Sequence, residues 1–217
     1  SIYSTNCSQI FSLLGYTFYF NPQINIKIHI NMINNKFHKH FFILFFLTIL
    51  LGCGNPDASN HIDIALEAEH RTPSYIKRDK YRHPKETLLF FGLNPEQSII
   101  EITPGYGWYA EILAPLIRNK GQYYYTSLKL HEKINPYFVK VEKAFKEKME
   151  KNPDIYDQLH WVHFDPKQPE FAPNGPVDMV LTFRNVHNWA KAGSAEAMFA
   201  GFAKALKPGG ILGLVEH

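Results

Sequence analysis

The sequence predicts an α/β fold with a doubly wound, mainly parallel sheet in residues 71–217. Three observations indicate this class: short apolar runs alternate with stretches of helical spacing, the first run leads into a glycine turn, and polar residues follow the ends of the runs. Strands that are separated by helices pair in parallel through right-handed crossovers. Ligands of such sheets bind at the carboxyl ends of the strands, so we expect the site there.

The elements follow one another along the chain. We expect helices at residues 62–69, 85–91, 108–118, 132–151 and 194–206, and strands at residues 98–102, 122–127, 159–164, 177–183 and 211–215. The second helix has Pro84 in its first turn and Gly92 at its end, where these residues are favoured. Ser194 can cap the last helix, and residues 207–210 end it as a turn. Residues 71–82 are basic and contain aromatic residues, and we expect a loop there that leads into the domain.

A basic and apolar segment nearer the N-terminus has the layout of a secretory signal. Lys36 and Lys39 precede the apolar run of residues 41–51, which is shorter than the roughly 20 residues of a spanning helix. Leu50-Leu51-Gly52-Cys53 resembles a bacterial lipobox, which implies that Cys53 is lipidated and becomes the mature N-terminus. A buried hydrophobic helix and an uncleaved anchor are the alternatives. We therefore expect an exported lipoprotein, anchored to a membrane of the bacterial cell envelope.

The same signal divides the chain into four parts. Met32 stands just before the basic region, so residues 32–53 form the expected signal peptide and residues 54–70 a polar tether with an N-terminal helix. Residues 1–31 show no clear periodicity of a helix or a strand. We exclude them from the fold, and interpret them either as translated upstream sequence or as belonging to a start of the protein that this sequence does not include. Residues 71–217 form one domain that stops directly after its fifth strand, and we expect it to be truncated at its C-terminal end.

Charge and cysteine content exclude several kinds of partner and site. The formal net charge of the 217 residues is +3 and the lysines are spread along the chain, so we expect no nucleic-acid partner. Cys7 lies in the leader and Cys53 in the lipobox, which leaves no disulfide framework. We also predict no metal site.

A glycine turn follows the first predicted strand. Gly105 and Gly107 allow a sharp turn and a close approach of the backbone to a ligand, and Glu101 could accept hydrogen bonds from that ligand or fix the turn. The other strand ends carry Asp165, residues 184–189, Glu216 and His217. Their shared position at one edge of the sheet predicts a single ligand site.

Several segments resemble a known family. Residues 101–107, Glu-Ile-Thr-Pro-Gly-Tyr-Gly, are similar to the first motif of class I S-adenosylmethionine-dependent methyltransferases, and residues 206–210, Leu-Lys-Pro-Gly-Gly, to the turn before their fifth strand. Residues 81–87, 104–109 and 181–189 resemble a group of bacterial predicted methyltransferases, many with export signals. The resemblance implies a Rossmann-like methyltransferase fold, S-adenosylmethionine as cofactor, and a small-molecule or unknown methyl acceptor.

Matching positions in this family imply roles for individual residues. The cofactor would be bound by Glu101, Pro104, Gly105, Gly107, Asp165 and Asn185. Asp165 would lie near the adenine, and the segment after the fourth strand would face the transferred methyl. In the family an acid usually ends the second strand and holds the ribose hydroxyls, but residues 126–130 contain none. Either Glu132 reaches back, or ribose binding is weak or different.

His187 and Arg184 are the candidate catalytic residues. An imidazole titrates near a pKa of about 6.5, and we expect His187 in a loop at a strand end, where it could be a general base. A structural histidine bonded to that loop is an equal alternative. Arg184 could orient an acidic acceptor or pair with Glu216. Trp108 and Trp189 could stack on adenine or cover the sulfonium, although core packing suits Trp108 better.

Three functions remain open at this point. The first is an exported, lipid-anchored methyltransferase, which the glycine turn and Asp165 favour. The second is a non-catalytic binding lipoprotein that keeps the fold, which export favours because the cofactor is made in the cytosol. The third is a nicotinamide-dependent Rossmann enzyme. Ala110 takes the place of the last glycine in G-x-G-x-x-G, which the looser pattern tolerates, but the later motifs do not support this class.

Overall fold

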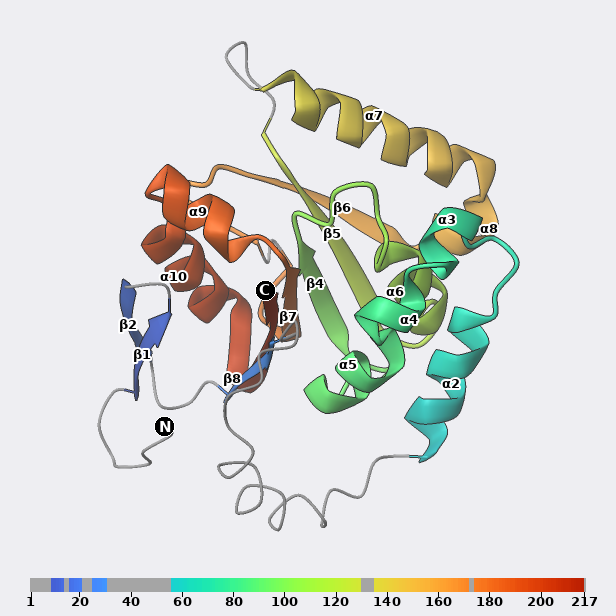
Figure 1. Ribbon diagram of the computed structural model, residues 1–217, viewed down its shortest axis with the longest axis horizontal. Helices are drawn as coiled ribbons and strands as arrows, with labels where there is room; N and C mark the ends of the chain where they lie inside the picture. Colours follow the sequence, from blue (N-terminus) through green and yellow to red (C-terminus); the bar gives the residue numbers. More distant parts are fainter. Residues whose placement is uncertain are drawn as a thin grey trace.

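A parallel sheet with helices on both faces forms the body of the protein (Figure 1). The computed structural model describes residues 9–13, 16–20, 25–30, 56–129, 135–171 and 174–216. The strands of this sheet are β3 (Asn25–Ile30), β4 (Ser98–Ile102), β5 (Gln122–Leu128), β6 (Leu159–Phe164), β7 (Val177–Phe183) and β8 (Leu206–Glu216). Within the described residues they pair in parallel in the order β3-β8-β7-β4-β5-β6. A separate antiparallel pair joins β1 (Gln9–Leu13) and β2 (Tyr16–Phe20).

Helices pack on the two faces of the sheet. The described helices are α2 (Pro56–Leu66), α3 (Pro73–Ile76), α4 (Asp79–Arg82), α5 (Pro84–Phe91), α6 (Ala110–Ile117), α7 (Pro136–Lys151), α8 (Pro153–Tyr156), α9 (Val186–Ala192) and α10 (Ala195–Ala205), of which α3 and α4 are short and bury no residue. One hydrophobic cluster joins α2, α5, α6, α7 and α8 to the first face, and a second joins α9 and α10 to the other (Figure 1). This arrangement leaves the carboxyl ends of β4, β5 and β7 as the edge where loops can form a site.

Successive residues of the inner strands pack on opposite faces. Ile99 of β4 and Met179 of β7 belong to the cluster with α5 and α6, whereas Ile100 and Val180 belong to the cluster with α10. All four side chains are fully buried. A strand that is covered on both faces is apolar throughout, and this explains the unbroken apolar runs in the sequence. The buried strands provide a rigid base for the loops at their ends.

Several predicted elements are confirmed. The fold class is the predicted one, and β4, β6 and β7 have the predicted bounds. Helix α5 begins at Pro84 and ends before Gly92, which has the left-handed conformation with φ of +76°. A left-handed glycine is a common helix terminator because it has no β-carbon to clash.

Four local predictions were wrong. Residues 71–82 contain the short helices α3 and α4 rather than a loop, and residues 186–192 form α9. Ser194 precedes α10 but makes no capping hydrogen bond with its side chain, because its φ of −105° and ψ of 0° are not the extended geometry of a cap. Residues 207–210 lie within β8 as an irregularity in its pairing with β7, instead of separating helix from strand.

The prediction that residues 1–31 lie outside the fold does not hold for residues 25–30. Residues 25–30 form β3, which pairs along β8 from Asn25 opposite Ile211 to Ile30 opposite Glu216. The sequence of this segment alternates isoleucine with polar residues, which is the period of a strand. In the full chain β3 thus covers the outer edge of β8. Cys53, the expected signal peptide and Glu132 lie outside the described residues. In the part of the chain that is described, no helix has the length and apolar character needed to cross a membrane.

Candidate functional site

A cavity of about 780 Å³ lies at the carboxyl ends of β4, β5 and β7. This volume is in the range of small-molecule and cofactor sites. The glycine turn after β4, the end of β5 and the first turn of α9 form its wall, and α3, α4 and α7 contribute side chains from above the sheet edge. Of the predicted site residues, Glu101, Pro104, Gly105, Arg184, Asn185 and His187 line it. Six of the eight predicted catalytic and cofactor-binding residues therefore lie at one cavity, and their individual roles stay predictions.

The backbone of the glycine turn is strained where it faces the cavity. Thr103 has a φ of +49°, which is unusual for a β-branched residue, and Gly105 has a φ of +63°. A β-carbon built on Gly105 would meet no atom within 4 Å, so the space beside this glycine is open. The Oγ1 of Thr103 is buried and has no hydrogen-bond partner among the described residues. Strained backbone and open space at the cavity wall together indicate a ligand position.

Gly107 has a different role from the one that we predicted for both glycines. It does not line the cavity. Its φ is +78°, and a β-carbon at this position would come within 2.4 Å of the Phe145 ring on α7. The glycine is therefore required for packing between the turn and α7, and its part in binding the cofactor stays a prediction.

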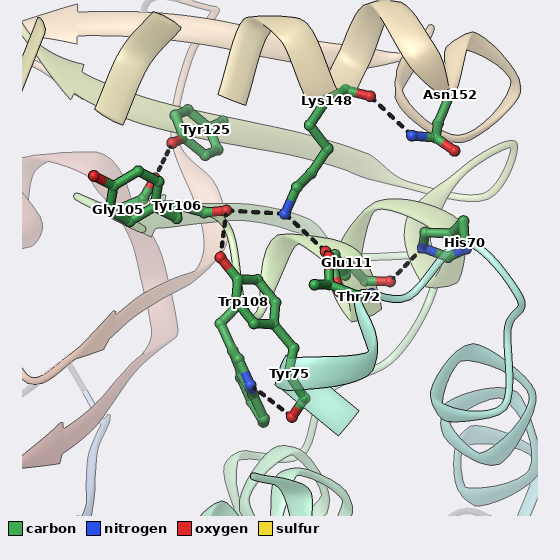
Figure 2. Close-up of polar contacts among 10 residues, drawn as sticks. All are labelled: His70, Thr72, Tyr75, Gly105, Tyr106, Trp108, Glu111, Tyr125, Lys148 and Asn152. Carbon is green, nitrogen blue, oxygen red and sulfur yellow. Dashed lines mark hydrogen bonds and ion pairs between the residues drawn. The ribbon is translucent and has the colours of Figure 1, made fainter. Parts of the chain in front are cut away.

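Hydrogen bonds from three elements fix the carbonyl groups of the turn (Figure 2). The Tyr125 hydroxyl on β5 donates to the Gly105 carbonyl at 2.6 Å. The Tyr106 carbonyl accepts from Lys148 Nζ on α7 at 3.1 Å and from the Tyr75 hydroxyl on α3 at 3.3 Å. Lys148 also donates at 2.7 Å to Glu111, which is buried in α6. The turn is thus held in one conformation before any ligand binds, which lowers the entropic cost of binding.

Glu101 is a buried acid at the end of β4. Its side chain is 1% exposed, and the Tyr123 hydroxyl donates to its Oε2 at 2.5 Å. Burial raises the pKa of Glu101 to about 8, although the hydrogen bond from Tyr123 opposes this rise. The carboxyl is therefore neutral at pH 7. The carboxyl is thus hydrogen-bonded within the protein to a residue of β5, and its part in binding the cofactor stays a prediction.

Glu142 of α7 supplies a carboxylate at the end of β5, where the expected acid is missing from the strand. It lines the cavity and accepts from the Ser127 hydroxyl at 3.1 Å and from Lys146 Nζ at 2.7 Å. Burial alone would raise its pKa, but hydrogen bonds from Lys146, His163 and Ser127 hold the pKa of Glu142 below its usual range. Sequence reasoning missed this residue because it considered only acids near the end of the strand.

His187 lies in the first turn of α9 and faces the cavity. Its Nδ1 is 2.9 Å from Oε1 of Glu216, a carboxylate at the end of β8 that is only 7% exposed. The other oxygen of Glu216 accepts the backbone N–H of Val186 at 2.9 Å. An imidazole that is oriented by a buried carboxylate and open to a cavity has the arrangement of a general base.

The two residues beside His187 differ in their roles. Asn185 donates from its side-chain amide to the carbonyl of Ile102 at 3.0 Å and to Oγ1 of Thr182 at 3.2 Å, so it links the ends of β4 and β7. Arg184 has a φ of +61°, and its backbone N–H donates to the Val215 carbonyl at 2.8 Å. This left-handed conformation directs the chain out of β7, with the Arg184 side chain at the cavity wall.

Asp165 lies outside the cavity lining, whereas Trp108 and Trp189 are part of it. Asp165 is exposed and outside the cavity lining, and its carboxylate accepts the backbone N–H of Lys167 at 2.9 Å, so its contact with adenine stays a prediction. Trp108 and Trp189 both line the cavity but are only 6% and 7% exposed. Trp108 donates from its indole to the Tyr75 carbonyl at 3.1 Å (Figure 2). Packing is therefore the main role of both rings.

Solved structures of similar architecture include methyltransferases. A protein-L-isoaspartate O-methyltransferase aligns with a TM-score of 0.51 at 18% identity, over 72% of this chain and 50% of that chain. The fold is the Rossmann-like methyltransferase fold. An S-adenosylmethionine-dependent methyltransferase from Aquifex aeolicus aligns at 18% identity with a TM-score of 0.47, over 69% of this chain and 68% of its own.

A glycopeptide N-methyltransferase, MtfA, in complex with sinefungin, aligns at 18% identity with a TM-score of 0.44. The match covers 60% of this chain and 51% of MtfA, so the chain spans about half the length of that enzyme. No family model and no curated protein matches the sequence. The structural likeness thus establishes the fold, and the argument for a function depends on the site.

Proposed function

We propose that the protein is an S-adenosylmethionine-dependent methyltransferase. The observation that carries this proposal is the turn after β4, where strained Thr103 and open Gly105 line a cofactor-sized cavity. Structures of the same fold that align less closely were crystallised with S-adenosylmethionine or with S-adenosylhomocysteine. The residues that line the cavity suit this cofactor.

The cavity offers groups for each part of the cofactor. Gly105 leaves room for close approach to the backbone, and the Glu142 carboxylate can accept hydrogen bonds from ribose hydroxyls in place of an acid on β5. Aromatic rings in the wall can stabilise a sulfonium cation by cation–π contact. When it is bound, S-adenosylmethionine supplies an electrophilic methyl group on this sulfonium.

The chain itself has to position the acceptor and remove its proton. Methyl transfer needs an in-line nucleophile and little covalent help, so orientation supplies much of the rate. If the acceptor is a hydroxyl or an amine, its proton can pass to the ring nitrogen of His187 that does not face Glu216. Glu216 then stabilises the resulting imidazolium, because its buried carboxylate lies 2.9 Å from Nδ1.

An S-adenosylhomocysteine release assay tests this proposal. The full chain is incubated with S-adenosylmethionine and fractions of a bacterial small-molecule extract, and the thioether product is measured. We expect at least one fraction to raise its formation above that in a control without extract. Tight cofactor binding without any turnover would instead favour the non-catalytic binding lipoprotein, and binding of NAD alone would favour the nicotinamide enzyme.

We further propose that the protein is exported and anchored to a membrane through lipid on Cys53; the processed chain then begins at Cys53 and no longer contains β3. The lipobox-like sequence Leu50-Leu51-Gly52-Cys53 and the basic flank before it support this location. In cells that are fed a fatty-acid probe, Cys53→Ser should abolish labelling, whereas the control Cys7→Ser should leave it unchanged. Equal labelling of Cys53→Ser and the parent would exclude this anchor.

A further inference from the structure

The segment that contains α3 and α4 has helical backbone from one end to the other. Lys77 and Arg78, which join the two short helices, both have right-handed helical angles. The Arg78 N–H donates to the Tyr75 carbonyl at 2.9 Å across this join, and His83, with a φ of +46°, ends the segment. The side chains of residues 73–82 therefore point outward with a helical period, and the segment has an inner and an outer face.

The inner face of this segment is held by contacts with the rest of the domain. The Tyr75 hydroxyl donates to a carbonyl of the glycine turn at 3.3 Å (Figure 2). Asp79 accepts two hydrogen bonds from the buried Arg71, at 2.6 and 3.0 Å. The Arg82 guanidinium lies 4.5 Å from the centroid of the Trp108 ring. Positions 75, 79 and 82 have the spacing of one helix face, so the positions between them point away from the domain.

The outer face combines exposed apolar and cationic side chains. Ile76 is 44% exposed and Tyr81 is 67% exposed. Lys77 and Lys80 are also exposed, and neither forms an ion pair with another described residue. Lys80 Nζ lies 4.7 Å from the centroid of the Tyr81 ring. Because Asp79, the acid of this segment, is turned inward, the outer face is positively charged.

An anionic lipid surface matches both parts of this face. Lipid phosphates attract lysine, and the boundary between headgroups and acyl chains accepts isoleucine and favours tyrosine. A nucleic acid duplex would contact the lysines but leave the isoleucine in water. Helix α7 also exposes an apolar side chain, Val139, but its lysines alternate with the exposed Glu147 and Glu150, so it has no comparable charge. Cys53, the proposed lipid site, precedes residues 73–82 in the chain and would bring them near a bilayer.

We propose that Ile76, Lys77, Lys80 and Tyr81 form a docking face for an anionic membrane surface. The lysines contact lipid phosphates, and the isoleucine and tyrosine lie at the level of the headgroups. The inner face of the same segment lines the cavity through Tyr75, so docking places the cavity beside the lipid headgroups. The inference goes beyond the proposed methyltransferase function and does not depend on it.

A fluorophore that responds to its environment tests which face contacts lipid. The full chain with Cys7→Ser and Cys53→Ser, which removes the lipid site, receives one new thiol for coupling to nitrobenzoxadiazole. The thiol is placed by Ser74→Cys, one helical turn before Lys77, or by the control Glu147→Cys on α7, and both positions are exposed. Each protein is floated with vesicles of phosphatidylcholine alone or with added phosphatidylglycerol. On the anionic vesicles we expect the fluorescence to rise and shift to the blue at position 74 and to stay unchanged at position 147.

Further variants of the protein labelled at position 74 assign the contact to the docking face. Lys77→Gln combined with Lys80→Gln should shift the docking equilibrium by about 10-fold and remove most of the rise. The matched pair Lys140→Gln and Lys143→Gln, which removes two exposed lysines of α7, should keep it. Ile76→Ser should also lower the rise, because it removes the apolar contact.

Several results would overturn the inference. They are no rise at position 74, an equal rise at positions 74 and 147, an equal rise on neutral vesicles, and a rise that the docking-face lysine pair or Ile76→Ser leaves unchanged. A rise that persists in Ile76→Ser and is removed by a DNA duplex would assign the face to nucleic acid, and would overturn the inference as well.

Discussion

Because the carboxyl of Glu101 is neutral, we predict that the variant Glu101→Gln changes how the stability of the protein depends on pH. The side chain is 1% exposed and accepts a hydrogen bond from Tyr123. Glutamine has nearly the same shape, and its carbonyl oxygen can accept the same hydrogen bond, but it cannot ionise. The variant therefore removes only the titration of this site, and it should fold and keep the turn after β4.

The size of the effect follows from the pKa. In the unfolded chain the carboxyl ionises near pH 4.5, whereas in the folded protein the pKa of Glu101 is about 8. Between these values the folded state holds a proton that the unfolded state has lost, so the free energy of unfolding falls as the pH rises. At 1.36 kcal/mol for each pH unit, the ionisation of Glu101 should lower the free energy of unfolding by roughly 4 kcal/mol from pH 5 to pH 8.

Urea unfolding of the parent and of Glu101→Gln at several pH values measures this effect. The difference between their free energies of unfolding should grow in favour of the variant from pH 5 to pH 8 and become constant above that. Glu147→Gln, which changes an exposed acid of α7, is the control and should follow the parent. Curves for the parent and Glu101→Gln that stay parallel over this range would refute the neutral carboxyl.

Three further predictions concern the rest of the site. His187→Ala should lower turnover by roughly 10²- to 10⁴-fold and leave the affinity for S-adenosylmethionine unchanged; turnover equal to the parent's would exclude the general base. Glu142→Gln should weaken binding of S-adenosylhomocysteine by about 10-fold in calorimetry, while Glu147→Gln should not, and equal affinities would remove Glu142 from the ribose position. Gly107→Ala should lower the free energy of unfolding by about 2 kcal/mol or more in urea, because its β-carbon would lie 2.4 Å from Phe145; unchanged stability would contradict the packing role.

Local sequence patterns predicted the strands and the glycine turn well. β4, β6 and β7 are short and buried, so burial on both faces is visible as an unbroken apolar run. Pro84 and Gly92 mark the ends of α5 because their effects on the backbone are intrinsic to these residues. Such features depend on only a few neighbouring residues, and one sequence is enough to find them.

Features that depend on tertiary packing could not be predicted in this way. Glu142 comes 15 residues after Ser127, and only the path of α7 brings its carboxylate to the end of β5. Tyr125 was expected only as a strand residue, but its hydroxyl supports the Gly105 carbonyl across the strand ends. α9 has seven residues, too few for a clear helical period. β3 was missed although residues 25–30 alternate isoleucine with polar residues, because one short alternating run does not show that it pairs with β8 at the other end of the chain.

Binding of S-adenosylmethionine to the turn after β4 is the central claim, and calorimetry of Gly105→Asn tests it most directly. Asparagine tolerates a positive φ, and its side chain would occupy the open space beside this glycine. Gly209→Asn is the matched control, since Gly209 has a φ of +78° and the same open surroundings but does not line the cavity. We predict that the parent and Gly209→Asn bind S-adenosylmethionine at one site and do not bind NAD, and that Gly105→Asn binds at least about 10-fold more weakly. A parent that does not bind S-adenosylmethionine, or a Gly105→Asn variant that binds it as tightly as Gly209→Asn, would contradict the claim.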